Sequence, residues 1–148
     1  MRVVACLILV VSVAVAACGG GGNSTTGPSP TLAGTWNATR AEFVSASNSS
    51  LRMEVVALGT AIVVTLTTAG TYTIRTTAPG TAPETETGTW TASTDVLTLR
   101  ATGQTGESQF SMTLSGNTLV LSGGHRLFDI NNDNVDEETI LSMTLSRQ

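Results

Sequence analysis

The chain has 148 residues, only 12% of which are charged, and its 11 acidic residues outnumber its seven basic ones. It contains no lysine, and its arginines are scattered singly, so no basic patch is available to bind nucleic acid. No phosphate-binding loop, dinucleotide fingerprint, G-x-S-x-G or H-E-x-x-H motif occurs, and the sequence therefore predicts a protein that is not an enzyme.

The N-terminal segment, residues 1–17, has the composition of an export signal. A short positive start precedes an almost purely apolar run over residues 3–15, which is shorter than the roughly 18–20 residues of a membrane-spanning helix. Small residues then lead into Cys18, which four glycines follow. The pattern resembles a bacterial lipoprotein signal. This resemblance implies that Cys18 receives acyl chains, palmitate among them, and becomes the new N-terminus.

A plain secretory signal is the alternative, because Ala14, Val15 and Ala16 also form an A-x-A cleavage site. Cleavage there would leave Cys18 as a lone thiol in an oxidising compartment, since Cys6 is removed with the signal, and lipidation avoids this problem. Two or more acyl chains hold a protein stably at a membrane. We therefore expect a lipid-anchored protein of the bacterial cell envelope, on the outer membrane, facing the periplasm or the cell surface.

Two further regions follow the signal. Residues 18–30 are rich in Gly, Ser, Thr and Pro, a composition that predicts a flexible tether with no core of its own. Residues 31–148 have the usual size of one domain. Without the signal, six arginines stand against 11 acidic residues, so the expected domain is acidic.

The domain has the pattern of an all-β protein. Thr and Ser alternate with Val, Ile, Leu and Met, as in antiparallel strands that have one apolar face, and no long helical pattern interrupts the series. Turn residues separate the runs. Eight strands are predicted, at residues 34–45, 51–67 with a break near Gly59, 70–77, 86–94, 96–102, 108–114, 118–130 and 138–146.

Eight strands joined by short turns favour an antiparallel up-and-down barrel, because closure removes both exposed sheet edges. A β-sandwich is the alternative architecture. Gly123 and Gly124 in the middle of the seventh predicted strand indicate a bulge or a bend, which either architecture accommodates.

The first strand opens with Gly34, Thr35 and Trp36, and Arg147 lies near the end of the chain. With the strand count and the domain length, this glycine–any residue–tryptophan triplet resembles a small bacterial lipocalin-like lipoprotein over about residues 32–148. The resemblance implies a lipocalin-like barrel in which Trp36 packs at the closed end and Arg147 lies across its ring. Such a cation–π contact contributes ~0.5–2 kcal/mol. Gly34, Trp36 and Arg147 would then be structural residues.

Three aromatic residues, Trp36, Tyr72 and Trp90, each follow a Gly-Thr pair. Core packing is one interpretation, and contact with a small apolar ligand inside the barrel is the other. We therefore expect a noncatalytic protein that binds a small hydrophobic ligand. The alternative is a structural or protein-interaction module of the envelope with a packed barrel.

The densest acidic stretch, residues 129–138, has the spacing of a calcium loop. Asn134 replaces the usual glycine, and Ile140 stands where a bidentate acid is expected, so the segment is not a helix–loop–helix calcium hand. A polar hairpin loop is the first interpretation, and a stabilising calcium ion is the second. The candidate ligands are the side chains or backbone of Asp129, Asn131, Asp133, Val135 and Glu137. No other cofactor is expected.

Overall fold

The computed structural model describes residues 31–148, so the predicted signal, Cys18 and the tether lie outside the described residues. The described chain is all β. None of it belongs to a helix with the length and apolarity that crossing a bilayer requires. Its strands are β1 (Gly34–Ser45), β2 (Arg52–Glu54), β3 (Ala61–Leu66), β4 (Thr71–Thr77), β5 (Glu84–Ala92), β6 (Val96–Ala101), β7 (Ser108–Ser115), β8 (Thr118–Phe128) and β9 (Glu137–Arg147).

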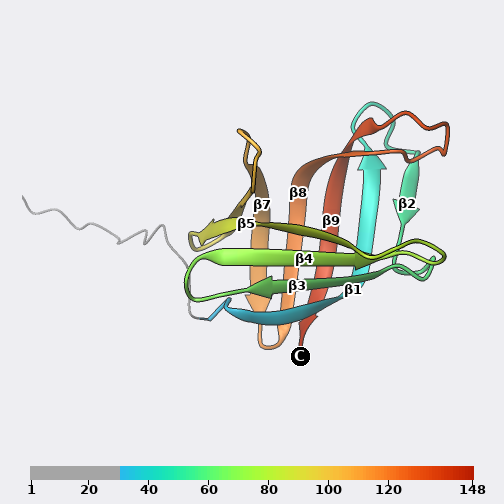
Figure 1. Cartoon of the computed structure of the whole chain (residues 1–148). Helices are drawn as coiled ribbons and strands as arrows, with labels where there is room; N and C mark the ends of the chain where they lie inside the picture. Colours follow the sequence, from blue (N-terminus) through green and yellow to red (C-terminus); the bar gives the residue numbers. More distant parts are fainter. Residues whose placement is uncertain (1–30) are drawn as a thin grey trace, which may run out of the picture.

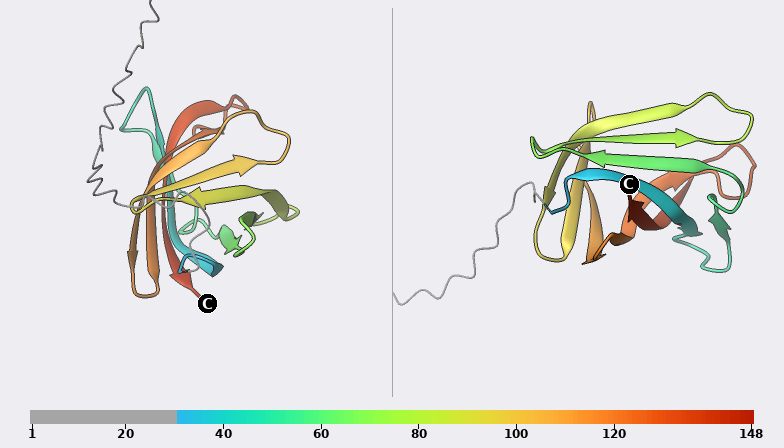
Figure 2. Two further views of the ribbon diagram at one scale, coloured as in Figure 1. Left: turned by 90° about the vertical axis from the view of Figure 1, so that its left-hand side faces the viewer. Right: turned by 90° about the horizontal axis from the view of Figure 1, so that it is seen from below.

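The strands close into a barrel (Figure 1). From β3 to β9 each strand pairs antiparallel with the next, and β1 pairs with both β3 and β9, which leaves β2 as a short addition beside β1. Seen from below, β3 and β4 lie on the opposite side of the barrel from β8 and β9 (Figure 2). The predicted eight-stranded up-and-down barrel is confirmed, and the closed ladder excludes the sandwich.

The second predicted strand is two strands, because residues 55–60 form a turn that includes the expected break at Gly59. β3 pairs with the first residues of β1, Gly34 to Asn37, whereas β2 pairs with Glu42 to Val44 near its other end. At this turn the chain therefore leaves the barrel wall, and it re-enters the wall at Ala61.

A second irregularity lies between β7 and β8. β8 bulges between Leu121 and Gly124, as the glycine pair predicts, and Gly123 has a φ of +87°. The β7–β8 ladder stops at the pair Ser111 and Ser122, so the first residues of β7 and the last ones of β8 do not pair with each other. The ring of Phe110 fills part of this gap, since a Cβ on Gly124 would lie only 1.9 Å from Phe110 Cε1.

Large inward-facing side chains fill the end of the barrel at which the chain enters β1, here called the packed end. Trp36 is 0% exposed, and its Nε1 donates a hydrogen bond to the carbonyl of Leu32 at 3.0 Å. The Arg147 guanidinium lies 4.2 Å from the centre of the Trp36 ring and donates to the carbonyls of Ala33 and Thr31. These contacts tie the two ends of the domain together.

Candidate functional site

The opposite end of the barrel, here called the open end, contains a cavity of about 480 Å³. Ligand pockets have this size and are mostly apolar. The side chains around it come from seven strands and two turns, and most of them are apolar. They are Phe43, Met53, Val55, Leu58, Thr60, Ile62, Ile74, Thr76, Ala78, Thr81, Ala82, Glu84, Arg126, Leu127, Phe128, Leu141 and Met143.

On β4 the inward-facing side chains become smaller toward the open end, which contributes to the hollow. On β4 the inward positions carry Tyr72 toward the packed end, then Ile74, then Thr76. Thr76 and Ile74 line the cavity, whereas the larger Tyr72 is 2% exposed and belongs to the core. The barrel therefore has too little side-chain volume to fill its open end.

The mouth of the cavity is apolar. Phe43 and Phe128 stack on each other, with ring centres 4.2 Å apart and an angle of 14° between their planes. Leu58 and Leu127 line the cavity and are 62% and 71% exposed. Exposed apolar groups around a concave apolar site are typical of a place where an apolar partner binds.

A polar network links the cavity wall to the core. Tyr72 donates its hydroxyl hydrogen bond to Glu86 Oε1 at 2.7 Å, and Arg126 Nη2 lies 3.5 Å from the same oxygen. Arg126 Nη1 also donates to Ser108 Oγ at 2.7 Å, so this side chain reaches across the gap between β8 and β7. Burial, and then the bond to Glu86, raise the pKa of Tyr72, which stays a neutral donor.

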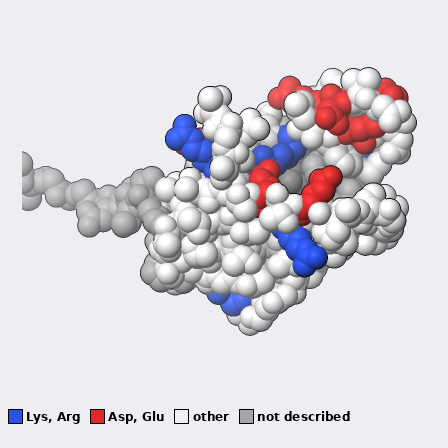
Figure 3. All heavy atoms as spheres, viewed as in Figure 1, with Lys and Arg blue, Asp and Glu red and all other residues white. Residues whose placement is uncertain are grey.

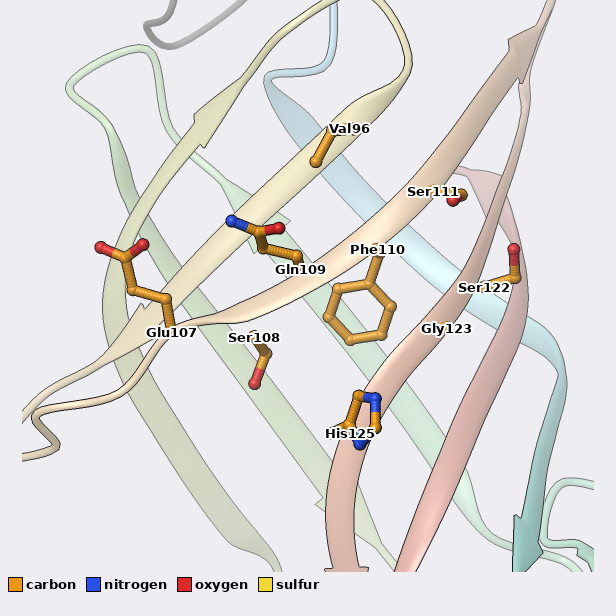
Figure 4. Close-up of a pocket in the computed structure, with 9 residues that line it drawn as sticks. All are labelled: Val96, Glu107, Ser108, Gln109, Phe110, Ser111, Ser122, Gly123 and His125. Atoms are coloured by element: carbon orange, nitrogen blue, oxygen red, sulfur yellow. The ribbon is translucent and has the colours of Figure 1, made fainter. Parts of the chain in front are cut away.

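The outer groove is a second hollow, of about 500 Å³, and lies where β7 and β8 separate. Figure 4 shows the rings of Phe110 and His125 facing this gap, among polar side chains. His125 Nδ1 lies 2.9 Å from Glu138 Oε1 on β9. The groove is more polar and more open than the cavity, so the cavity is the better candidate for an apolar ligand.

The three aromatic residues considered as ligand contacts do not line the cavity. Trp36 and Trp90 lie in the core, and the Trp90 Nε1 donates to the carbonyl of Thr67 at 3.0 Å. Tyr72 reaches the edge of the cavity only through its bond to Glu86. The residues that do line the cavity are medium-sized, and their alternation along β3, β4 and β9 was the sequence signal for an inward face. Ligand contact by the three aromatic rings stays a prediction.

Glu54 holds the turn that carries Val55, Leu58 and Thr60 to the cavity. Its carboxylate accepts backbone hydrogen bonds from Ala41, Val56 and Ala57, at 2.7, 3.2 and 2.6 Å. Burial alone would raise the pKa of this carboxyl. The three backbone donors, with the charge of Arg40, outweigh burial and lower the pKa below 4.5.

A lowered pKa in the folded state means that ionised Glu54 stabilises the fold at neutral pH, and that this contribution is lost as the pH falls through the folded-state pKa. We expect Glu54→Gln to unfold at lower urea concentration at neutral pH, and the difference from the wild type to shrink as the pH falls below 4.5. Glu107→Gln, a carboxylate removed from the outer groove, controls for net charge. A difference that stays constant with pH would contradict this role.

The acidic stretch forms the loop between β8 and β9. Asp129, Asp133 and Glu137 each offer an oxygen, and these oxygens lie within 4.8 Å of one another. Each also accepts a loop hydrogen bond, such as those from the backbone N–H of Asp133 to Asp129 Oδ1 and of Val135 to Asp133 Oδ1. Asn131 donates to Asp133 and Glu137. The hairpin interpretation accounts for these contacts, and calcium binding stays a prediction.

A family model described as a lipocalin-like domain matches residues 32–121, which is more than half of the chain. The matched segment includes Trp36 and most of the cavity wall, and it ends within β8, before Arg126 and the acidic loop. No curated protein matches the chain.

Proposed function

The chain belongs to the lipocalin-like domain family, and from this premise we propose that it binds a small hydrophobic ligand in the cavity at the open end of its barrel. The observation that carries the proposal is the contrast between the two ends. The packed end is filled by large rings, whereas the open end keeps about 480 Å³ lined mainly by apolar side chains. This contrast favours ligand binding over the alternative of a packed structural module.

The proposed action is noncatalytic. The family fold is typically a binding fold, and Arg126, the basic side chain of the cavity wall, is already paired with Glu86 and Ser108. Apolar burial, at about 25 cal/mol per Å² of apolar surface, would supply the affinity. The protein would hold its ligand and release it unchanged.

The proposed place of action is the bacterial cell envelope. Cys18 in its lipoprotein-like context supports attachment through acyl chains, which would hold the domain at a membrane while the barrel stays in the aqueous space. We expect Cys18→Ala to abolish incorporation of labelled palmitate and to move the protein from the membrane fraction to the soluble fraction. Cys6→Ala, in the part expected to be removed, is the matched control and would leave both properties unchanged.

Filling the cavity tests the proposed ligand site. Ile74 lies on β4 and lines the cavity, so the larger ring of Ile74→Trp should occupy part of the volume and reduce binding of the neutral fluorescent probe N-phenyl-1-naphthylamine at least tenfold. The full chain carrying Cys18→Ala would be titrated, because it needs no detergent. Thr73→Trp places the same ring on the outer face of β4 and should leave probe binding unchanged. Equal probe binding by the two variants would mean that the probe binds outside the cavity.

A further inference from the structure

The two charged side chains of the cavity wall, Glu84 and Arg126, differ in whether they are paired. Glu84 lines the cavity, and among the described residues no basic side chain lies within ion-pair distance of Glu84. Arg126 is the basic side chain of the cavity wall, and its charge is shared with Glu86 at 3.5 Å. The charge of Glu84 is therefore unpaired at the cavity, whereas the charge of Arg126 is already paired.

The surroundings of the mouth have the same sign of charge as Glu84. β8 and β9 both contribute cavity residues, and the loop between them carries five acidic residues within positions 129–138. Figure 3 shows acidic atoms beside a hollow in this face, with basic atoms next to them, and a second acidic group at the end of the molecule where this loop lies. An excess of one sign of charge around a mouth raises the local concentration of ligands of the opposite sign.

The arginines do not offset this charge at the mouth. Arg40 and Arg52 both pair with Glu42, at 3.1 and 3.9 Å. Arg147 lies at the packed end, over Trp36. Arg75 is on β4 between Ile74 and Thr76, and because successive side chains alternate it points away from the cavity that its neighbours line.

We propose that the cavity selects amphiphiles with a cationic head, such as alkylammonium compounds. This inference rests on the proposed function and names its ligand class. The alkyl chain lies against the apolar wall formed by Ile62, Ile74, Leu141 and Met143, and the head lies beside Glu84. An anionic head would be repelled by the unpaired Glu84. To pair with Arg126 it would have to displace Glu86, so both effects weaken binding of an anion.

Competition between probes of opposite charge tests the proposal. Bound N-phenyl-1-naphthylamine would be displaced from the full chain carrying Cys18→Ala by dodecyltrimethylammonium and by dodecanoate, each below its micelle concentration. We expect the cation to compete at a concentration at least tenfold lower than the anion. Glu84→Gln should weaken binding of the cation about threefold, which is the effect expected for one partly exposed ion pair. Binding of the neutral probe should not change. Glu107→Gln removes the same charge from the outer groove and should change neither the binding of the cation nor that of the neutral probe.

The outcomes separate the two proposals. Preference for the cation that depends on Glu84 supports the charge selection. Equal competition by the two ions, tighter binding of the anion, or a preference that Glu84→Gln does not reduce overturns it while leaving the apolar site intact. A protein that does not bind the neutral probe, the cation or the anion overturns the proposed function itself, and the charge selection with it.

Discussion

Replacing Trp36 by alanine is expected to lower the free energy of unfolding by about 3–5 kcal/mol, the range observed when a fully buried large aromatic residue is truncated. The indole is 0% exposed, so its removal leaves a void at the packed end. It also removes the hydrogen bond to Leu32 and the surface on which Arg147 rests. A domain of this size has roughly 5–15 kcal/mol of stability in total, so the loss is a large part of it.

Urea denaturation followed by the fluorescence of the remaining Trp90 would measure this loss. Leu127→Ala is the control, because it also truncates a large apolar residue, but one that is 71% exposed, and its stability should change by less than about 0.5 kcal/mol. If Trp36→Ala were no more destabilising than Leu127→Ala, the packed end would not be the centre of stability.

Gly88→Ala is expected to cost about 3 kcal/mol, at the upper end of the range for an overpacked core. A Cβ at this position would lie 2.1 Å from the backbone oxygen of Arg100 and 2.6 Å from Tyr72 Cε1. Because Arg100 is in the neighbouring strand β6, its carbonyl can move only if the β5–β6 ladder shifts. The Tyr72 ring would also be displaced, and its bond to Glu86 with it.

Thermal unfolding of Gly88→Ala beside Gly106→Ala isolates this steric effect. Gly106 has no atom within 4 Å of its would-be Cβ, and its backbone is not in the left-handed region, so alanine there should leave the melting temperature unchanged or slightly raised. Equal melting temperatures for the two variants would mean that the β5–β6 ladder yields at little cost.

The fold was predictable because its signals are local. Period-two alternation gave the strands, and the triplet at Gly34–Trp36 with Arg147 indicated the barrel type. Strand ends were less predictable. The seventh predicted strand stops at Phe128, because Asp129 begins a turn in which Asn132 and Asn134 have positive φ angles. Such ends depend on single backbone angles, which alternation does not report.

The cavity was not predictable, because it depends on contacts between distant residues. Arg126 meets Glu86, 40 positions earlier, only because the β7–β8 ladder stops early and leaves a gap that the side chain crosses. Gly123 and Gly124 indicated the bulge, but nothing local indicated that the strands would separate beyond it. Likewise, Tyr72 and Ile74 both occupy inward-facing positions of the same alternating strand. Only their distance from the packed end decides that Ile74 lines the cavity and Tyr72 fills the core.

The two ends of β1 relate the point at which the chain enters the barrel to the mouth of the cavity. The described chain enters this strand at Gly34, beside Arg147, and Phe43 near its other end lines the mouth. β1 bends along its length (Figure 1), with a register shift between Ala38 and Arg40, and it runs from the packed end to the open end, so the entry point and the mouth lie at opposite ends of the barrel. A domain attached through the segment before Thr31 would be held at the end of the barrel opposite the mouth. The mouth would then stay clear of the attachment point, and ligand would enter it from the aqueous space.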